Sequence, residues 1–326
     1  MSDVGLNLIK DTSTGLYCKL ADLWIDPNKP VKRALLTHAH MDHFTFGCEE
    51  YISTYETAFI LKERTGKEIN IRTYDYGEEF KINGTNISFH PSGHILGSSQ
   101  IKITLADEKW LITGDFKRQT DETCKKYETI KTDFIISEST FGLPIFKWDD
   151  PQDTAKEITK WVSLSPKKTS VLFCYSLGKA QRLLNEINKT NHKHKIYTHS
   201  SINKMTNCYK KLGIDIIDTR KFDQKKNTED LRGSLLLLPP ALNKNSLLKE
   251  FKDIQTGFAS GWMSIRALRK RSGYDKGFSI SDHADWEDIL NTVKESEAKN
   301  VFFYHGDSEA LNRFLNEDKS INVLNL

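Results

Sequence analysis

The sequence has few cysteines, and their spacing argues against two common uses of thiols. Five cysteines occur among 326 residues, and no two of them are spaced as CxxC. A disulfide-stabilised secreted domain and a zinc site built from cysteines are therefore both disfavoured. We expect reduced thiols in a cytoplasmic protein.

Long apolar runs are also missing. The longest, Leu235 to Pro240, is far too short to cross a bilayer. The first residues show no basic segment followed by an apolar stretch, so we expect no signal peptide and no membrane association. The net charge is only +3, and any basic surface for a nucleic-acid partner must therefore be local.

The composition is that of a globular protein, and the chain is long enough for two domains. Short runs rich in β-branched and aromatic residues alternate with helical patterns, which predicts an α/β class. The predicted strands are 34–36, 101–105, 110–112, 134–136, 171–174, 235–238, 278–280 and 301–304. The predicted helices are 153–164, 178–188, 203–212, 286–297 and 308–316.

Several of the predicted strands lead into a side chain that can bind a metal. The residues that follow strand ends in this way are His38 and His40, Asp115, Glu138, His283 and His305. Sites in α/β folds are built where strand ends meet loops. We therefore expect these side chains to converge.

The densest group of such residues is the HxHxDH motif at residues 38–43. Imidazole and carboxylate groups suit zinc or manganese. Residues two apart on an extended segment point the same way, so His38 and His40 can hold one ion together. Asp42 and His43 can address a second ion. Two ions can polarise a phosphoryl group and activate a bridging water.

Three further residues complete the expected ligand sets. His94 lies in a glycine-rich loop, Asp115 follows Gly114, and His305 precedes Gly306. We assign the first ion to His38, His40, His94 and Asp115. We assign the second ion to Asp42, His43, Asp115 and His305, with Asp115 bridging. A second HxH pair, His192 and His194, stands among lysines without an acidic partner and is interpreted as solvated surface.

The HxHxDH motif resembles the signature of the metallo-β-lactamase superfamily, and the order of motifs resembles its β-CASP branch. Glu138, His283 and His305 resemble the three further motifs of that branch, and Asp26 resembles an early structural aspartate of the superfamily. Four segments resemble the bacterial DNA-ligase-associated exonucleases within the branch: 114–119, 138–144, 175–182 and 258–263.

The resemblance implies a fold and a domain organisation. A four-layer αββα metallo-β-lactamase sandwich would use residues 1–143 and 281–326, and an α/β β-CASP domain would be inserted at 144–280. Metal-ligand candidates in the sequence occur on both sides of this middle stretch and not within it, which agrees with that division.

The resemblance also implies a function: a phosphodiesterase that acts on DNA, an exonuclease in repair, with two divalent ions (zinc or manganese) and a bridging hydroxide as nucleophile. We expect His283 to protonate the leaving oxygen and Glu138 to accept a hydrogen bond from His283. A pathway link to a DNA ligase and a helicase is implied by the resemblance alone.

Substrate contacts are expected at two places. Arg266, Arg269 and Lys270 fall at helical spacing, which predicts a basic face for phosphates, with Ile265 and Leu268 turned inward. Lys117 and Arg118 follow Asp115 and are expected to reach the nucleic-acid backbone, and Trp262 to stack on a base. The ordinary alternative for each is a solvated face or a packing contact.

Three other functions remain open at this point. An RNA-processing nuclease of the same branch would use the same metal chemistry. Hydrolysis of a small ester or lactam is disfavoured by Glu138, His283 and the large middle insertion. A member that only binds nucleic acid is disfavoured because all seven ligand candidates are present.

Overall fold

The computed structural model describes residues 8–105, 108–223, 231–243, 248, 251 and 253–326. The chain divides into two compact units. Unit 1 comprises residues 1–144 and 283–326, and unit 2 comprises residues 145–282. Each unit has its own sheets and its own hydrophobic core, and each is described by itself below.

The first sheet of unit 1 has six strands in sequence order. They are β1 (Ile9–Thr12), β2 (Gly15–Cys18), β3 (Leu23–Ile25), β4 (Arg33–Leu35), β5 (Glu50–Ser53) and β6 (Ile71–Thr73). The pairs among β1, β2 and β3 are antiparallel, whereas β3 to β6 pair in parallel.

The second sheet of unit 1 has seven strands in the order β19-β18-β11-β10-β9-β8-β7. They are β7 (Glu79–Ile82), β8 (Thr85–Pro91), β9 (Ser99–Leu105), β10 (Glu108–Ile112), β11 (Phe134–Ser139), β18 (Asn300–Gly306) and β19 (Asn322–Val323). β7 to β10 form antiparallel pairs, and β10, β11, β18 and β19 pair in parallel. The parallel strands bring residues from both ends of the chain together.

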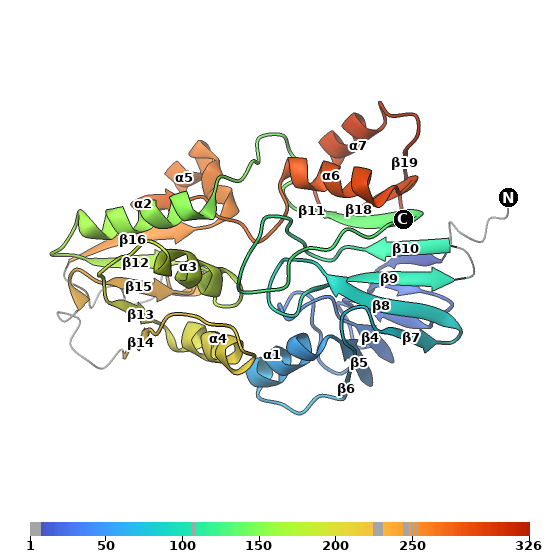
Figure 1. Ribbon diagram of the computed structural model, residues 1–326, viewed down its shortest axis with the longest axis horizontal. Helices are drawn as coiled ribbons and strands as arrows, with labels where there is room; N and C mark the ends of the chain where they lie inside the picture. Colours follow the sequence, from blue (N-terminus) through green and yellow to red (C-terminus); the bar gives the residue numbers. More distant parts are fainter. Residues whose placement is uncertain (1–7, 106–107, 224–230, 244–247, 249–250, 252) are drawn as a thin grey trace. The chain divides into compact units, whose positions relative to one another are not determined.

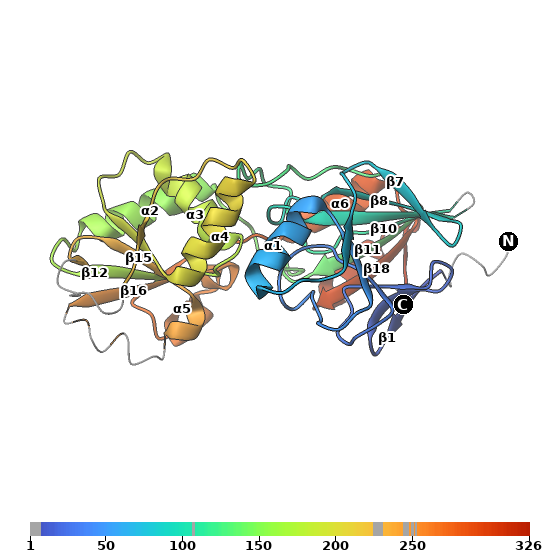
Figure 2. The ribbon, with the colours of Figure 1, turned by 90° about the horizontal axis from the view of Figure 1, so that it is seen from below.

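The two sheets pack face to face around one apolar core. That core joins buried side chains of the first sheet (Leu16, Ile25, Leu35, Ile52) to those of the second (Ile101, Trp110, Ile112, Phe302). The helices α6 (Trp286–Ser296) and α7 (Glu309–Leu315) cover the second sheet, and α1 (Tyr55–Thr65) covers the first (Figure 1). Seen from below, α1 lies in front of the sheets and α6 behind them (Figure 2). Unit 1 is therefore a four-layer αββα sandwich.

Local sequence explains where these helices begin and end. The Thr54 hydroxyl caps α1 by accepting a hydrogen bond from the Thr57 N–H, and Gly66 closes the helix in the left-handed conformation (φ 65°). The Asp285 carboxylate caps α6 by accepting from the Asp288 N–H at 2.9 Å. This cap fixes the start of α6 at Trp286, three residues after His283.

Unit 2 is built on one parallel sheet in the order β14-β13-β15-β12-β16-β17. Its strands are β12 (Thr169–Phe173), β13 (Ile196–Thr198), β14 (Arg220–Lys221), β15 (Leu235–Leu238), β16 (Ile254–Ala259) and β17 (Lys276–Phe278). Its helices are α2 (Pro151–Ser163), α3 (Lys179–Asn188), α4 (Ser200–Lys211) and α5 (Arg266–Arg271), with single 3-10 turns at Pro240–Leu242 and Gly261–Ser264. β12 and β15 are buried throughout, as expected for inner strands of a parallel sheet.

The predicted α/β class is confirmed, and the predicted strands and helices fall on observed elements with one clear shift. β17 spans 276–278 rather than 278–280. All five cysteines are free thiols. Within the described residues, the helices are too short or too polar to cross a membrane.

Candidate metal centre and catalytic residues

One carboxylate, Asp26 at the end of β3, organises the loop that carries the HxHxDH motif. Its Oδ1 accepts the Thr37 N–H at 2.8 Å, and its Oδ2 accepts the Thr37 hydroxyl at 2.5 Å. The same Oδ2 lies 2.8 Å from Nδ1 of His43. Asp26 therefore holds both ends of the motif, as the resemblance implied. Asp26 itself adopts a left-handed backbone conformation, with a φ of 44°.

The loop between β8 and β9 delivers His94 to the same place. The Ser92 hydroxyl donates to the Asp115 carbonyl oxygen at 2.9 Å, and the Ser99 N–H donates to the Thr37 carbonyl oxygen at 2.8 Å. Gly93 has a φ of 75°, and a Cβ there would lie 2.2 Å from the Lys117 carbonyl oxygen. Only glycine permits this close approach, and His94 is consequently buried next to Asp115.

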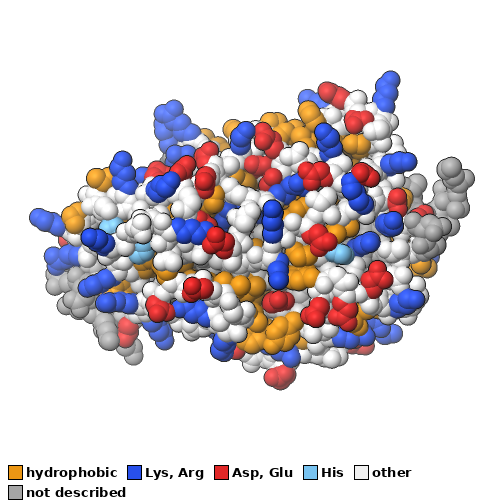
Figure 3. All heavy atoms as spheres, viewed as in Figure 1, with side chains coloured by type: hydrophobic (Ala, Val, Ile, Leu, Met, Phe, Trp, Pro, Cys, Tyr) orange, Lys and Arg blue, Asp and Glu red, His pale blue; other side chains and the backbone are white. Residues whose placement is uncertain are grey.

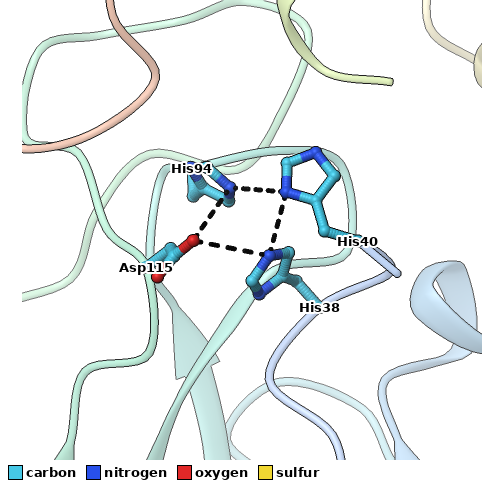
Figure 4. A group of neighbouring side chains, drawn as sticks. All are labelled: His38, His40, His94 and Asp115. Carbon is cyan, nitrogen blue, oxygen red and sulfur yellow. Dashed lines mark hydrogen bonds and ion pairs between the residues drawn. The ribbon is translucent and has the colours of Figure 1, made fainter. Parts of the chain in front are cut away.

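Four side chains converge to form the cluster shown in Figure 4: His38, His40, His94 and Asp115. Nδ1 of His40 lies 3.0 Å from Nε2 of His38 and 3.2 Å from Nε2 of His94. Oδ2 of Asp115 lies 3.6 Å from Nε2 of His38 and 3.7 Å from Nε2 of His94.

These separations fit a bound cation. Ligand atoms at about 2.0–2.1 Å from a tetrahedral zinc ion are roughly 3.3 Å apart, by the geometry of such sites. Three imidazole nitrogens and a carboxylate oxygen form a donor set that suits zinc or manganese. The structure therefore brings together the set that the sequence assigned to the first ion.

The electrostatics of the cluster favour the ligand-competent forms. Burial, followed by the neighbouring imidazoles of His43, His94 and His40, holds the pKa of His38 well below its usual value. Burial opposes ionisation of Asp115, but the surrounding histidines, His43 first, hold the pKa of Asp115 below its ordinary range. A neutral imidazole and an ionised carboxylate are the forms that bind metal.

Asp115 also connects this cluster to residues assigned to the second ion. Its Oδ2 lies 3.5 Å from Nε2 of His43. Burial alone would lower the pKa of His43, but the carboxylates of Asp115 and Asp26 raise it to about 10. Gly114 positions the aspartate: its φ is 54°, and a Cβ there would lie 2.8 Å from Cβ of Thr37.

The rest of the second set is less tightly assembled. His305 is exposed at the end of β18, with its ring centroid 5.8 Å from that of His43. Both histidines line a cavity of about 20 Å³, room for about one water molecule. Asp42 is exposed, and its charge contributes to the raised pKa of His43.

A second compact group joins Asp115 to Glu138 and His283. Nδ1 of His283 lies 2.8 Å from Oε2 of Glu138, so the hydrogen bond expected between these two side chains is present. Nε2 of His283 lies 3.9 Å from Oδ2 of Asp115. His283 thus presents one ring nitrogen to Glu138 and the other to the metal cluster.

Glu138 is fixed in turn by its surroundings. Its carboxylate accepts the Phe116 N–H at 2.7 Å and the Thr140 hydroxyl at 2.6 Å, and its side chain is buried. The Ala284 N–H donates to the Phe116 carbonyl oxygen at 2.7 Å. The segments that carry Asp115, Glu138 and His283 are therefore locked to one another by hydrogen bonds.

The residues predicted to contact substrate in unit 1 need correction. Lys117 is buried, with 1% of its surface exposed, so the prediction that it reaches a nucleic-acid backbone is wrong. Arg118 pairs with Glu295 at 2.7 Å, lies 4.0 Å from Asp288 and stacks over Tyr127. This partly exposed arginine is engaged by the carboxylates of α6, and its contact with nucleic acid stays a prediction.

The remaining substrate candidates lie in unit 2. Arg266, Arg269 and Lys270 are exposed on α5, as predicted, and Arg269 donates to the Met263 carbonyl oxygen. The prediction that Leu268 turns inward is wrong, because it is 37% exposed. Trp262 is 42% exposed and packs edge-on against Phe146.

Sequence reasoning overlooked two positioning residues. Thr37 donates twice to Asp26, and its hydroxyl lies 3.0 Å from Nδ1 of His38, which leaves Nε2 of His38 facing the cluster. Ser92 ties the His94 loop to the Asp115 backbone. The sequence signal that could have identified them is their position, because each carries a hydroxyl group and lies within two positions of an expected metal ligand.

Comparisons with known proteins place this geometry in context. No protein-family model matches the chain. The chain is 28% identical to a probable DNA ligase of Opitutus terrae over 90% of its own length and 29% of that protein. It is 29% identical to cleavage and polyadenylation specificity factor 73 of Drosophila melanogaster, over 47% of this chain and 23% of that protein.

Two further comparisons cover most of the chain. It is 23% identical to endoribonuclease YSH1 of Kluyveromyces lactis, over 74% of this chain and 39% of that protein. The chain thus corresponds to well under half the length of each of these three relatives. A crystal structure of a protein of unknown function from Enterococcus faecalis V583 shares the fold with a TM-score of 0.55 at 15% identity. The match covers 90% of this chain and 78% of that one.

The chain combines an αββα sandwich, a His–Asp cluster at its strand ends and the paired Glu138 and His283. These relatives support assignment of the chain to the β-CASP branch of the metallo-β-lactamase superfamily.

Proposed function

We propose that this chain is a divalent-metal-dependent nuclease that hydrolyses phosphodiester bonds in DNA, as an exonuclease in DNA repair. The observation that carries the proposal is the position of Asp115. Its carboxylate faces three imidazoles of the His38, His40 and His94 cluster on one side and the His283–Glu138 pair on the other. A metal-binding group and a proton-transfer group therefore share one carboxylate.

His38, His40, His94 and Asp115 would hold one zinc or manganese ion. His43, with Asp115, Asp42 and His305, would hold the second. When bound, divalent ions supply Lewis-acid stabilisation of the phosphoryl oxygens and activate water for attack on phosphorus.

The chain itself supplies the proton for the leaving group. Hydrolysis adds a hydroxyl group to phosphorus and breaks a P–O bond, and the departing oxygen must gain a proton. Glu138 accepts a hydrogen bond from Nδ1 of His283 and favours the doubly protonated imidazole. Nε2 of His283 then donates its proton to the leaving oxygen. Glu138 and the Phe116–Ala284 backbone contact keep the ring oriented toward Asp115.

Unit 1 is proposed as the metallo-β-lactamase domain and unit 2 as the inserted β-CASP domain. The exposed basic face of α5 and the exposed ring of Trp262 remain the candidates for substrate contacts. Cations on one helix face suit a phosphate backbone, and an exposed indole suits a terminal base.

DNA is favoured as substrate because the likeness to the Opitutus terrae probable DNA ligase extends over 90% of this chain. The same likeness supports action in one pathway with a ligase, and with a helicase. RNA cleavage is the second candidate, favoured by the likeness to endoribonuclease YSH1 over 74% of the chain.

The test is a timed digestion of matched end-labelled DNA and RNA, single- and double-stranded, with manganese or zinc. We expect single-nucleotide products from a DNA end, none with chelator, and none from Asp115→Ala. Internal cuts in RNA with intact DNA would favour the endoribonuclease. No metal-dependent cleavage of any strand would overturn the proposal.

A further inference from the structure

A cavity of about 300 Å³ lies at one edge of unit 2, away from the strand ends that lead to His283. We name it the edge pocket, and its lining includes His192, His194, Lys195, Asp218 and Arg220. These residues precede β13 and lie at the start of β14, so the pocket sits at the amino ends of the parallel strands. The chain continues to His283 from the carboxyl end of β17. That end of the parallel sheet is opposite the end at which the pocket lies. The volume is at the lower end of the range for small-molecule sites.

The HxH pair that the sequence placed on solvated surface forms one wall of the edge pocket. The rings of His192 and His194 are nearly parallel, with 10° between their planes and 6.3 Å between their centroids. Rings stacked directly on one another would be about 3.5–4.0 Å apart, and a third flat ring inserted between them would need about 7 Å, so the two rings would have to move apart by about 0.7 Å to admit one. The Ser163 hydroxyl, 2.9 Å from Nε2 of His194, holds one of the two rings in place.

The charge around these rings is positive. Asp218, the acidic residue in the lining, is held by Lys210 at 2.5 Å and has a fully exposed side chain. Lys195 and Arg220 have no carboxylate partner within the described part of the chain. The Arg220 guanidinium lies 5.9 Å from the centroid of the Tyr197 ring, with Nη1 3.5 Å from the Tyr197 hydroxyl.

On the face seen in Figure 3, lysine and arginine side chains are interspersed with acidic side chains over both units. A metal ion is disfavoured in the edge pocket, because His192, His194 and Asp218 are not among the groups of three close ligand atoms found in the described residues.

We propose that the edge pocket binds a nucleoside phosphate, with its base between the rings of His192 and His194 and its phosphate on Lys195 and Arg220. Flat bases of any sequence stack on parallel rings, and a guanidinium with an ammonium beside it matches a phosphate. The nucleoside phosphate has two sources: a free mononucleotide, or one residue of a nucleic-acid strand. This site does not depend on the metal centre.

The test measures binding by the full chain in excess chelator, where no hydrolysis can occur. The probes are adenosine 5′-monophosphate, inorganic phosphate and a five-nucleotide DNA strand, titrated by calorimetry. We expect the mononucleotide or the strand to bind more tightly than inorganic phosphate. We also expect at least tenfold weaker binding in His192→Ala/His194→Ala and in Arg220→Gln. Lys131→Gln removes an exposed charge from unit 1 and serves as the control, with unchanged affinity.

The two sources give different results. If the mononucleotide binds and both variants weaken its binding, the ligand is a free nucleotide. If only the five-nucleotide strand binds, and both variants weaken its binding, the ligand is a residue of a nucleic-acid strand. Equal affinity for inorganic phosphate and the nucleotide, or affinities unchanged in both variants, would overturn the proposal. Because hydrolysis is blocked throughout, such a failure is separate from any failure of the proposed nuclease.

Discussion

Nδ1 of His283 lies 2.8 Å from Oε2 of Glu138, although 144 residues separate the two along the chain. The contact orients the imidazole so that Nε2 faces Asp115 at 3.9 Å. A histidine held in this way can move a proton without being needed to hold a metal. In the proposed mechanism, this relationship would separate proton transfer from metal binding within one site.

Replacing His283 with alanine should therefore remove turnover and leave the metal in place. We expect kcat on a DNA substrate to fall by about 10²- to 10⁴-fold, the range for loss of a general acid, with metal content unchanged by elemental analysis. His90→Ala is the matched control, because His90 contacts Ser88 and Glu128 outside the cluster. Loss of bound metal in His283→Ala would instead make this histidine a ligand.

Gly114 offers a test of how the backbone positions Asp115. An added Cβ would meet Cβ of Thr37 at 2.8 Å, in a conformation (φ 54°) that alanine adopts at a cost of about 1–2 kcal/mol. Gly114→Ala should therefore lose stability and weaken metal binding. Gly84 also has a positive φ, 81°, but a Cβ there would meet open space. Gly84→Ala should therefore show only the conformational cost in stability. Equal effects of the two substitutions on unfolding midpoint and metal affinity would contradict this account.

Unit 2 contains a buried ion pair just before His283. Nζ of Lys179 lies 3.0 Å from Oδ2 of Asp282, with only 5% and 6% of the two side chains exposed. Lys179→Met should lower the free energy of unfolding by about 3–5 kcal/mol, because it leaves a buried carboxylate without this cation. Lys156→Met breaks an exposed pair with Asp153 and should change stability little. Urea denaturation measures both, and similar small losses would show that the buried pair is energetically neutral.

Stability should also depend on pH through Asp288. Burial and the neighbouring carboxylate of Asp285 raise the pKa of Asp288 to about 6, although Arg118 opposes the shift. A raised carboxyl pKa means that the folded state binds the proton more tightly, so stability is full below about pH 4 and falls as pH rises through 6.

Asp288→Asn removes this titration. The stability of the variant relative to the native chain should rise by about 1 kcal/mol between pH 4.5 and 7.5, after allowance for solvent screening. Glu309→Gln, at the exposed start of α7, should show no such rise. A constant or falling difference for Asp288→Asn in chemical denaturation at the two pH values would refute the assignment.

Some of the fold and site followed from sequence because the signals are local. The HxHxDH spacing places His38 and His40 side by side in the loop after β4, with 3.0 Å between Nε2 of His38 and Nδ1 of His40, and strand ends carry Asp115 and Glu138 toward them. Other features depend on tertiary packing. Arg118 pairs with residues of α6 that lie 170 or more positions away in sequence, and no local pattern reports such a pairing or the burial of Lys117.

The prediction that α5 has a buried apolar face also failed. The apolar spacing of Ile265 and Leu268 predicted an inward face, but a helix of six residues has no buried residue and leaves Leu268 in solvent. The antiparallel strands β7 and β8 were not predicted, because alternation over four residues, as in Glu79–Ile82, is short. Asp42 and His305 matched the motif order, yet both side chains are exposed, so sequence order alone did not fix their distance from the cluster.

The most direct test of the account is anomalous X-ray scattering from crystals of the full chain grown with manganese or zinc. The account predicts a strong peak within bonding distance of His38, His40, His94 and Asp115, and a second peak beside His43 on the other side of Asp115. Both peaks should vanish in Asp115→Ala. Metal bound only elsewhere on the chain, or a vacant cluster at saturating metal, would contradict it.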